Sequence, residues 1–156
     1  MPQPTFISSD AMLSHWQAHR RLTRRVIEAF PEDKLFTFSV GGMRSFGEMC
    51  NEFLAMTVPM TAGLVTGTWG DYAQGKASTK AEVLTAWDAD TAKLDELWAQ
   101  IPAAHFLEER TAFGRWPGKV HDLLLYVIDN EIHHRGQGYV YLRALGIEPP
   151  PFYERG

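Results

Sequence analysis

Several features that mark specialised classes of protein are missing from this sequence of 156 residues. Cys50 is its single cysteine, so the chain forms no internal disulfide and suits a reducing compartment. There is no run of about 18 apolar residues, the length that a transmembrane helix needs. Basic residues are outnumbered, with 15 Lys and Arg against 19 Asp and Glu, which argues against a nucleic-acid binder with a broad basic face.

The N-terminus also lacks a recognisable targeting signal. Its first ten residues, MPQPTFISSD, contain no basic segment followed by an apolar one, so we expect no signal peptide. Together these absences predict a cytoplasmic protein without membrane or nucleic-acid partners. The length, a hydrophobic content of 45% and a charged content of 22% predict a single globular domain over residues 1–156.

What the sequence does contain is apolar residues that recur at spacings of three and four, which is typical of amphipathic helices. Four such stretches are separated by segments marked by glycine and proline, and this arrangement predicts an all-α protein folded as a helix bundle. Residues 103–118 are the exception, because part of them could form a strand or an irregular arm. The predicted helices cover residues 9–30, 45 to before 63, 79–100 and 119–145.

Residues at the helix ends support these boundaries. Ser9 or Asp10 is expected to cap the first helix. Ser45 and Glu48 have the spacing of a capping box at the start of the second helix, which Pro59 should kink or shorten. The basic residues of the first helix are expected on its sides away from the apolar stripe. They are Arg20, Arg21, Arg24 and Arg25.

The densest group of chemically active side chains is DNEIHHRGQ, residues 129–137, in the fourth predicted helix. Asn130 and His134 are four positions apart, so they stack on one face, and that face is otherwise apolar. We therefore expect both side chains to point into the bundle. A buried polar group without a partner costs about 1–3 kcal/mol, so the pair needs each other, a water, a metal or a polar residue on a facing helix.

Two further groups could supply metal ligands. Glu52 borders the apolar stripe of the second helix, from which its carboxylate could reach the interior, although periodicity is equally consistent with a solvated flank. His15 and His19 lie four apart on the first helix and form a rival candidate for a metal site. Hydrogen-bonded histidines in the core or at a helix seam would give the same pattern.

Two segments of the sequence resemble a known family. HHRGQGYVYLRALGIEPP, residues 133–150, resembles the C-terminal signature of the DinB-like family of damage-inducible bundle proteins. FPEDKLFTFSVGGMRSFGEM, residues 30–49, is similar to that family's end of helix one, connector and start of helix two. The resemblance implies a four-helix bundle with up-down-down-up topology, and a homodimer.

The resemblance also implies a metal site. Members of the family commonly hold a divalent metal, often nickel or zinc, with one histidine from the second helix and two from the fourth. The matching positions in this sequence are Glu52, Asn130 and His134, so one of the three histidines is present. A glutamate, an asparagine and a histidine form a harder site with more oxygen ligands. Such a site prefers Mg²⁺, Mn²⁺ or Fe²⁺ to Ni²⁺ or Zn²⁺, or it binds no metal.

Two functions follow from the resemblance. The first is a divalent-metal-dependent enzyme that transfers a low-molecular-weight thiol or hydrolyses a small substrate, with the metal held at Glu52, Asn130 and His134. No catalytic or substrate-binding residue is assigned beyond these ligands. The second is a degenerate, metal-free member that acts as a dimeric, stress-associated binding protein. Direct contact between Glu52 and His134 in a closed interior is the expectation for the second function.

Overall fold

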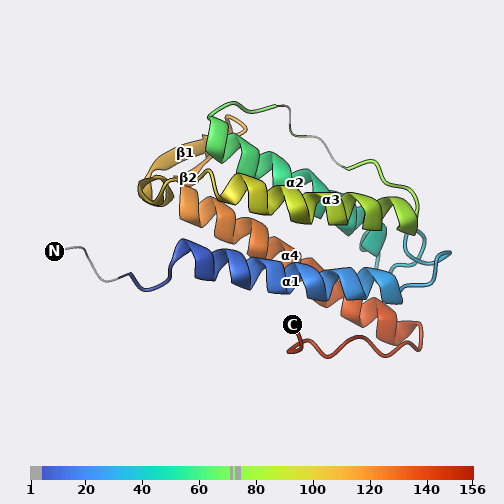
Figure 1. Ribbon diagram of the computed structural model, residues 1–156. Coiled ribbons are helices and arrows are strands. Elements are labelled where there is room, and N and C mark those ends of the chain that lie inside the picture. Colours follow the sequence, from blue (N-terminus) through green and yellow to red (C-terminus); the bar gives the residue numbers. More distant parts are fainter. Residues whose placement is uncertain (1–4, 71, 73–74) are drawn as a thin grey trace.

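Four long helices make up most of this computed structural model, which describes residues 5–70, 72 and 75–156 (Figure 1). They are α1 (Ser9–Ala29), α2 (Phe46–Thr66), α3 (Lys80–Trp98) and α4 (Val120–Ala144). In the described part of the chain, none of these helices combines the length and apolarity that a bilayer crossing requires.

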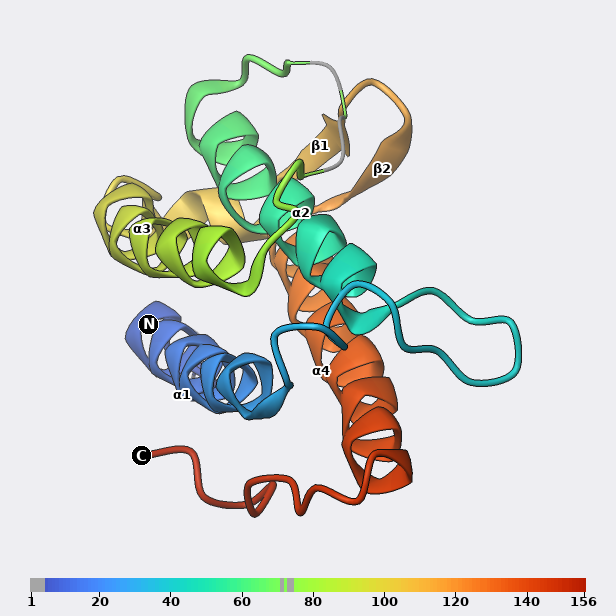
Figure 2. The same ribbon diagram turned by 90° about the vertical axis from the view of Figure 1, so that its right-hand side faces the viewer.

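The helices are arranged with up-down-down-up topology. Figure 1 shows α1 and α4 running in one direction along the bundle, and α2 and α3 running in the other. Both α1 and α2 pack against α3 and against α4, as the view along the bundle in Figure 2 also shows. The predicted four-helix bundle is thereby confirmed. Because α4 lies between α1 and α2, two of its sides are buried, and this decides where its polar residues face.

The interior of the bundle contains two hydrophobic clusters. The cluster toward the start of α1 and the start of α4 includes Trp16 and Leu124, both fully buried. The cluster at the opposite end includes Phe46, Phe53 and Trp87, whose rings pack edge to face at centroid distances of 6.0–6.3 Å. The helix spacing of apolar residues thus corresponds to a core that runs the length of the bundle.

The capping box at the start of α2 is present as predicted. The Glu48 backbone N–H donates to Ser45 Oγ at 3.2 Å, and the Glu48 carboxylate accepts from the Ser45 backbone N–H at 2.8 Å. Replacing Ser45 by alanine is expected to lower the free energy of unfolding by about 1 kcal/mol, because the Glu48 backbone N–H loses its acceptor. Urea denaturation measures the loss. Ser39→Ala, in the exposed connector, is the control, and equal losses in both variants would contradict the prediction.

Two details of the helix ends differ from the prediction. Ser8, rather than Ser9 or Asp10, caps α1, because Ser8 Oγ accepts from the Ala11 backbone N–H at 3.1 Å. Pro59 does not shorten α2, which continues to Thr66. Proline removes one N–H from the helix ladder, but Pro59 is exposed while the residues on the opposite side of α2 are buried, and that packing holds the helix together.

The segment between α3 and α4 contains a short hairpin. Its elements are η1 (Ala103–Leu107), β1 (Glu109–Ala112) and β2 (Trp116–Lys119), the two strands being antiparallel. Phe113 and Gly114 in the turn have positive φ angles of 52° and 68°. A bulky residue seldom adopts this conformation. The Phe113 ring packs against Trp69 at a centroid distance of 4.9 Å, so this contact ties the hairpin to the loop that follows α2.

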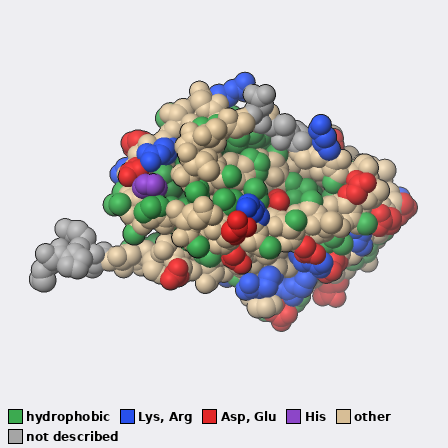
Figure 3. All heavy atoms as spheres, turned by 45° about the horizontal axis from the view of Figure 1, so that its top comes forward, with side chains coloured by type: hydrophobic (Ala, Val, Ile, Leu, Met, Phe, Trp, Pro, Cys, Tyr) green, Lys and Arg blue, Asp and Glu red, His purple; other side chains and the backbone are tan. Residues whose placement is uncertain are grey.

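The surface carries charge of both signs. On the face shown in Figure 3, Lys and Arg side chains lie among Asp and Glu side chains, mainly around the edges, with hydrophobic side chains between them. This distribution agrees with the formal net charge of −4. On that face the structure accordingly offers scattered charges rather than a broad basic surface.

Candidate functional site

The structure brings two of the three predicted metal ligands together at the seam between α2 and α4. His134 Nε2 lies 3.4 Å from Glu52 Oε1. Their side chains are only 14% and 16% exposed. Asn130 lies one turn from His134, and its Nδ2 is 3.3 Å from Met56 Sδ. The three residues therefore share one region, with the carboxylate and the imidazole facing each other and the asparagine amide nitrogen directed at a sulfur.

Arg44 completes this group, although no pattern in the sequence indicates that it belongs there. It lies in the connector just before α2, and its guanidinium forms an ion pair with Glu52. A second guanidinium nitrogen, Nη2, lies 3.5 Å from His134 Nε2. A cation is therefore already placed against both side chains that converge at the seam. Arg44 is 42% exposed at the side chain, so solvent or a ligand has access to this arrangement.

The proton on His134 follows from its other neighbour. His134 Nδ1 lies 2.6 Å from Gln137 Oε1, an oxygen that only accepts hydrogen bonds. This assignment places the imidazole hydrogen on Nδ1 and leaves the Nε2 lone pair directed at Arg44 and Glu52. A histidine fixed in this way is oriented either to bind a cation or to accept a hydrogen bond from a guanidinium.

Tyr72, in the loop after α2, lies within electrostatic range of the same group. Burial raises the pKa of its phenol, and the negative charge of Glu52 raises it further, while Arg44 lowers it. The Tyr72 ring also packs edge to face on Trp116 of the hairpin, with centroids 5.6 Å apart. The loop and the hairpin therefore meet through these aromatic rings, within electrostatic range of the polar group at the α2–α4 seam.

A second polar group lies on the opposite side of α4, facing α1. Glu131 is 1% exposed, and its Oε1 is 2.6 Å from Thr23 Oγ1. Arg135 is also buried and donates to Thr23 Oγ1 at 3.3 Å. Burial raises the pKa of Glu131. Helix spacing placed the buried polar pair of α4 at Asn130 and His134, but those residues are half-buried and Glu131 and Arg135 are the fully buried ones.

The rival pair on α1 is divided between surface and interior. The rings of His15 and His19 are in contact, with centroids 4.5 Å apart, but His15 is exposed and His19 is buried. Both ring nitrogens of His19 contact guanidinium groups, of Arg135 at 3.0 Å and of Arg155 at 2.8 Å. Neither nitrogen is directed at a second metal-binding side chain.

Carboxylate, imidazole and thiol groups are otherwise dispersed. Within the residues that the structure describes, no three His, Cys, Asp or Glu side chains are close enough together to hold a metal ion. The predicted set has only two side chains of these types, Glu52 and His134, with an amide as the third. Cys50 is fully buried, and burial raises the pKa of its thiol well above its usual range, which makes it a poor nucleophile.

Comparison with known sequences decides the family. The sequence pattern that defines the DinB family matches residues 1–156. The chain belongs to the DinB family. One relative is the uncharacterised protein YjoA of Bacillus subtilis (strain 168). It is 24% identical to this DinB chain over 151 residues, and the match covers 94% of this chain and 97% of YjoA.

Solved structures of DinB-like proteins share the fold. The crystal structure of YjoA superimposes with a TM-score of 0.75 at 21% identity and covers 93% of this DinB chain and 99% of its own. A DinB-like protein from Bacillus cereus ATCC 10987 gives a TM-score of 0.75 at 18% identity, covering 92% and 97%. These similarities establish the bundle, and the function has to be argued from the side chains of this chain.

Proposed function

We propose that this DinB-family chain is a metal-free binding protein in which the Arg44 guanidinium takes the place of a divalent cation between Glu52 and His134. The contact of Arg44 with both residues carries the proposal. A small molecule is the proposed ligand, reached from the exposed side of Arg44. We further propose that the protein is a homodimer associated with stress responses, as its family resemblance implies. Its single cysteine favours a cytoplasmic location.

Charge balance supports this proposal. A half-buried carboxylate needs a positive partner, and Arg44 supplies one without any bound ion. The Nε2 lone pair of His134 then accepts from the same guanidinium, so donor and acceptor are matched across the seam. A divalent cation would have to enter beside this positive charge. At a separation of a few Å, repulsion between like charges is worth about 4 kcal/mol per unit charge at an effective dielectric constant near 20.

A metal-dependent enzyme is the second candidate, and one observation favours it. Gln137 orients the His134 imidazole so that its Nε2 and the Glu52 carboxylate oxygen face each other at 3.4 Å, an arrangement in which both could bind one ion. Glu52, Asn130 and His134 would hold the ion, which could be Ni²⁺, Zn²⁺, Mn²⁺ or Fe²⁺. The ion would supply Lewis acidity for the transfer of a low-molecular-weight thiol or the hydrolysis of a small substrate.

Metal analysis of the purified chain distinguishes these two candidates. Protein prepared without chelator is expected to contain far less than one divalent metal per chain. Arg44→Ala is expected to bind Mn²⁺ or Ni²⁺ at least about tenfold more tightly than the wild type, since it removes the competing charge and frees Glu52. Isothermal titration with each ion measures the change.

The controls locate the effect at the seam. Arg115→Ala, which removes an exposed arginine of the hairpin turn, is expected to bind metal as weakly as the wild type. The double variant Arg44→Ala/Glu52→Gln is expected to lose the gain. Near-stoichiometric metal in the wild type that disappears in both Glu52→Ala and His134→Ala would overturn the metal-free proposal and establish the enzyme candidate.

A further inference from the structure

His19 on α1 lies between two arginines that come from distant parts of the chain. Its Nδ1 is 3.0 Å from Nη2 of Arg135 on α4. Its Nε2 is 2.8 Å from Nη1 of Arg155, which belongs to the segment after α4. Figure 2 shows this C-terminal segment turning back from the end of α4 toward α1. His19 is 5% exposed, and its contact with Arg135 is buried while its contact with Arg155 is part-buried.

The two contacts cannot both be hydrogen bonds. A guanidinium group only donates, and a neutral imidazole has one lone pair, whereas a protonated imidazole has none. Burial is the main cause that lowers the pKa of His19 from 6.5 to about 4, with the positive charge of Arg135 second, so the ring is neutral near pH 7. One arginine therefore has an acceptor on His19, and the other faces an N–H group.

We infer that Arg135, rather than Arg155, obtains the lone pair. It is buried, and its other guanidinium nitrogen donates to the His19 backbone carbonyl at 3.0 Å and to Thr23 Oγ1 at 3.3 Å. These bonds fix the guanidinium in front of Nδ1. The imidazole hydrogen then lies on Nε2, where it is directed at the N–H groups of Arg155. Two donors converge on one point with no acceptor between them.

Positive charge accumulates around this point. Arg21 and Arg25 of α1 donate to the backbone carbonyls of Arg155 and Glu154, so they hold the C-terminal segment against α1. Among the described residues, no carboxylate side chain forms an ion pair with Arg21, Arg25, Arg135 or Arg155. The one buried acid nearby, Glu131, is bonded to Thr23 through Oε1 and lies within electrostatic range of Arg135, but it forms no ion pair with Arg155. A group with negative charge and acceptor oxygens is the chemical complement of this arrangement.

We propose that an oxyanion, a carboxylate or phosphate group of a small molecule, binds between the Nε2–H of His19 and the guanidinium of Arg155, where the C-terminal segment crosses α1. The Arg155 side chain has a flexible stem, so it moves outward to admit the oxygen and then donates to it. Arg135 donates to Nδ1 and so holds the imidazole with its Nε2–H directed at the proposed site. This site is on the α1 side of α4 and is independent of the function proposed at the α2–α4 seam.

The tautomer of His19 is the first test. Long-range ¹H–¹⁵N NMR of the full chain at neutral pH shows which ring nitrogen carries hydrogen, with His19→Gln used to assign the signals. Hydrogen on Nε2 is the expected result. Hydrogen on Nδ1 would mean that Arg155 donates to Nε2, and the proposal would be overturned because the converging donors would not exist.

Titration with inorganic phosphate at constant ionic strength is the second test. A saturable shift of the His19 Nε2 signal is expected, and Arg155→Gln should weaken binding about tenfold or more, because it removes a charge-assisted hydrogen bond. Arg143→Gln, which removes an exposed arginine of the last turn of α4, should leave binding unchanged. A parallel titration with acetate separates a preference for carboxylate from one for phosphate. Equal weakening in both variants, or no saturable shift with either anion, would overturn the proposal.

Discussion

Replacing Arg20 by alanine is expected to lower the free energy of unfolding by about 3–5 kcal/mol, because a large buried side chain and the hydrogen bonds of a charged group are lost together. Arg20 is 1% exposed. It donates to Thr91 Oγ1 from Nε at 3.1 Å and from Nη2 at 3.0 Å, and Nη2 also donates to the Trp87 carbonyl at 3.0 Å. Its guanidinium carbon lies 4.0 Å from the Trp87 ring centroid. Truncation removes these contacts and leaves a cavity between α1 and α3.

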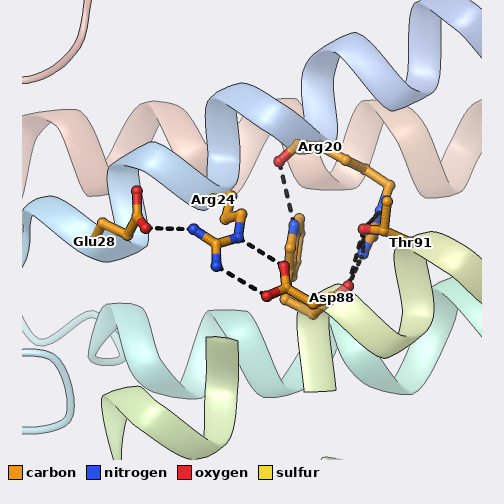
Figure 4. A network of polar contacts seen from close by, with 6 residues as sticks. Arg20, Arg24, Glu28, Asp88 and Thr91 are labelled. Atoms are coloured by element: carbon orange, nitrogen blue, oxygen red, sulfur yellow. Dashed lines mark hydrogen bonds and ion pairs between the residues drawn. The ribbon is translucent and has the colours of Figure 1, made fainter. Parts of the chain in front are cut away.

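Arg24, one turn further along α1, is the matched control (Figure 4). It forms ion pairs with Asp88 and Glu28, more charged contacts than Arg20 makes, but its side chain is 35% exposed. Exposed ion pairs are screened by water and contribute about 0–1 kcal/mol, so Arg24→Ala should cost no more than that. Urea denaturation of both variants makes the comparison. Similar losses in the two would show that burial of Arg20 is not what stabilises the α1–α3 contact.

The sequence predicted the helices well because the relevant interactions are local. A capping box is formed by residues three positions apart, and Ser45 with Glu48 gave the start of α2. Gly146, at φ 76°, follows the end of α4, where a left-handed residue without a side chain is favoured. Spacings of three and four then gave the apolar stripes. The hairpin was predicted less well, since its strands have only four residues each and no clear alternation.

The sequence did not predict which polar residues are buried. Helix spacing predicts the four arginines of α1 on the sides away from the apolar stripe. In the structure Arg20 is fully buried, and only Arg21 of the four is exposed. Periodicity gives the direction of an apolar stripe and not its width. Here α3 and α4 pack on two sides of α1, so the buried arc extends beyond the stripe. The same effect on α4 buries Glu131 and Arg135 beside the predicted Asn130 and His134.

The candidate site was predicted in part for a related reason. Glu52 and His134 were found from the family resemblance together with helix spacing, and the structure places their polar atoms 3.4 Å apart. Arg44 was not found, because it lies in an irregular connector where no periodicity indicates a direction. Its contact with Glu52, eight positions along the chain, depends on how the connector folds over the start of α2.

His19 is expected to make the protein less stable as the pH falls from 6.5 to about 4. The pKa of His19 is about 4 in the folded chain against 6.5 for a free histidine, because burial and the neighbouring arginines disfavour its charged form. Between these values the unfolded chain binds a proton that the folded chain does not, so acid favours unfolding. At about 1.4 kcal/mol per pH unit, the shift corresponds to a loss of about 3 kcal/mol, complete near pH 4.

Asp90 acts in the opposite direction, so the effect of His19 has to be measured as a difference. Burial raises the pKa of Asp90 from 3.8 to about 6, and the folded chain therefore gains this proton first and becomes more stable as the pH falls through that range. His19→Gln retains an acceptor for Arg135 but does not titrate. Its stability relative to the wild type should rise by about 3 kcal/mol between pH 6.5 and 4 in urea denaturation. His133→Gln, which removes an exposed histidine of α4, is the control. A constant difference between His19→Gln and the wild type across this range would mean that His19 is protonated in the folded chain, and its contacts with both arginines would then have to be broken.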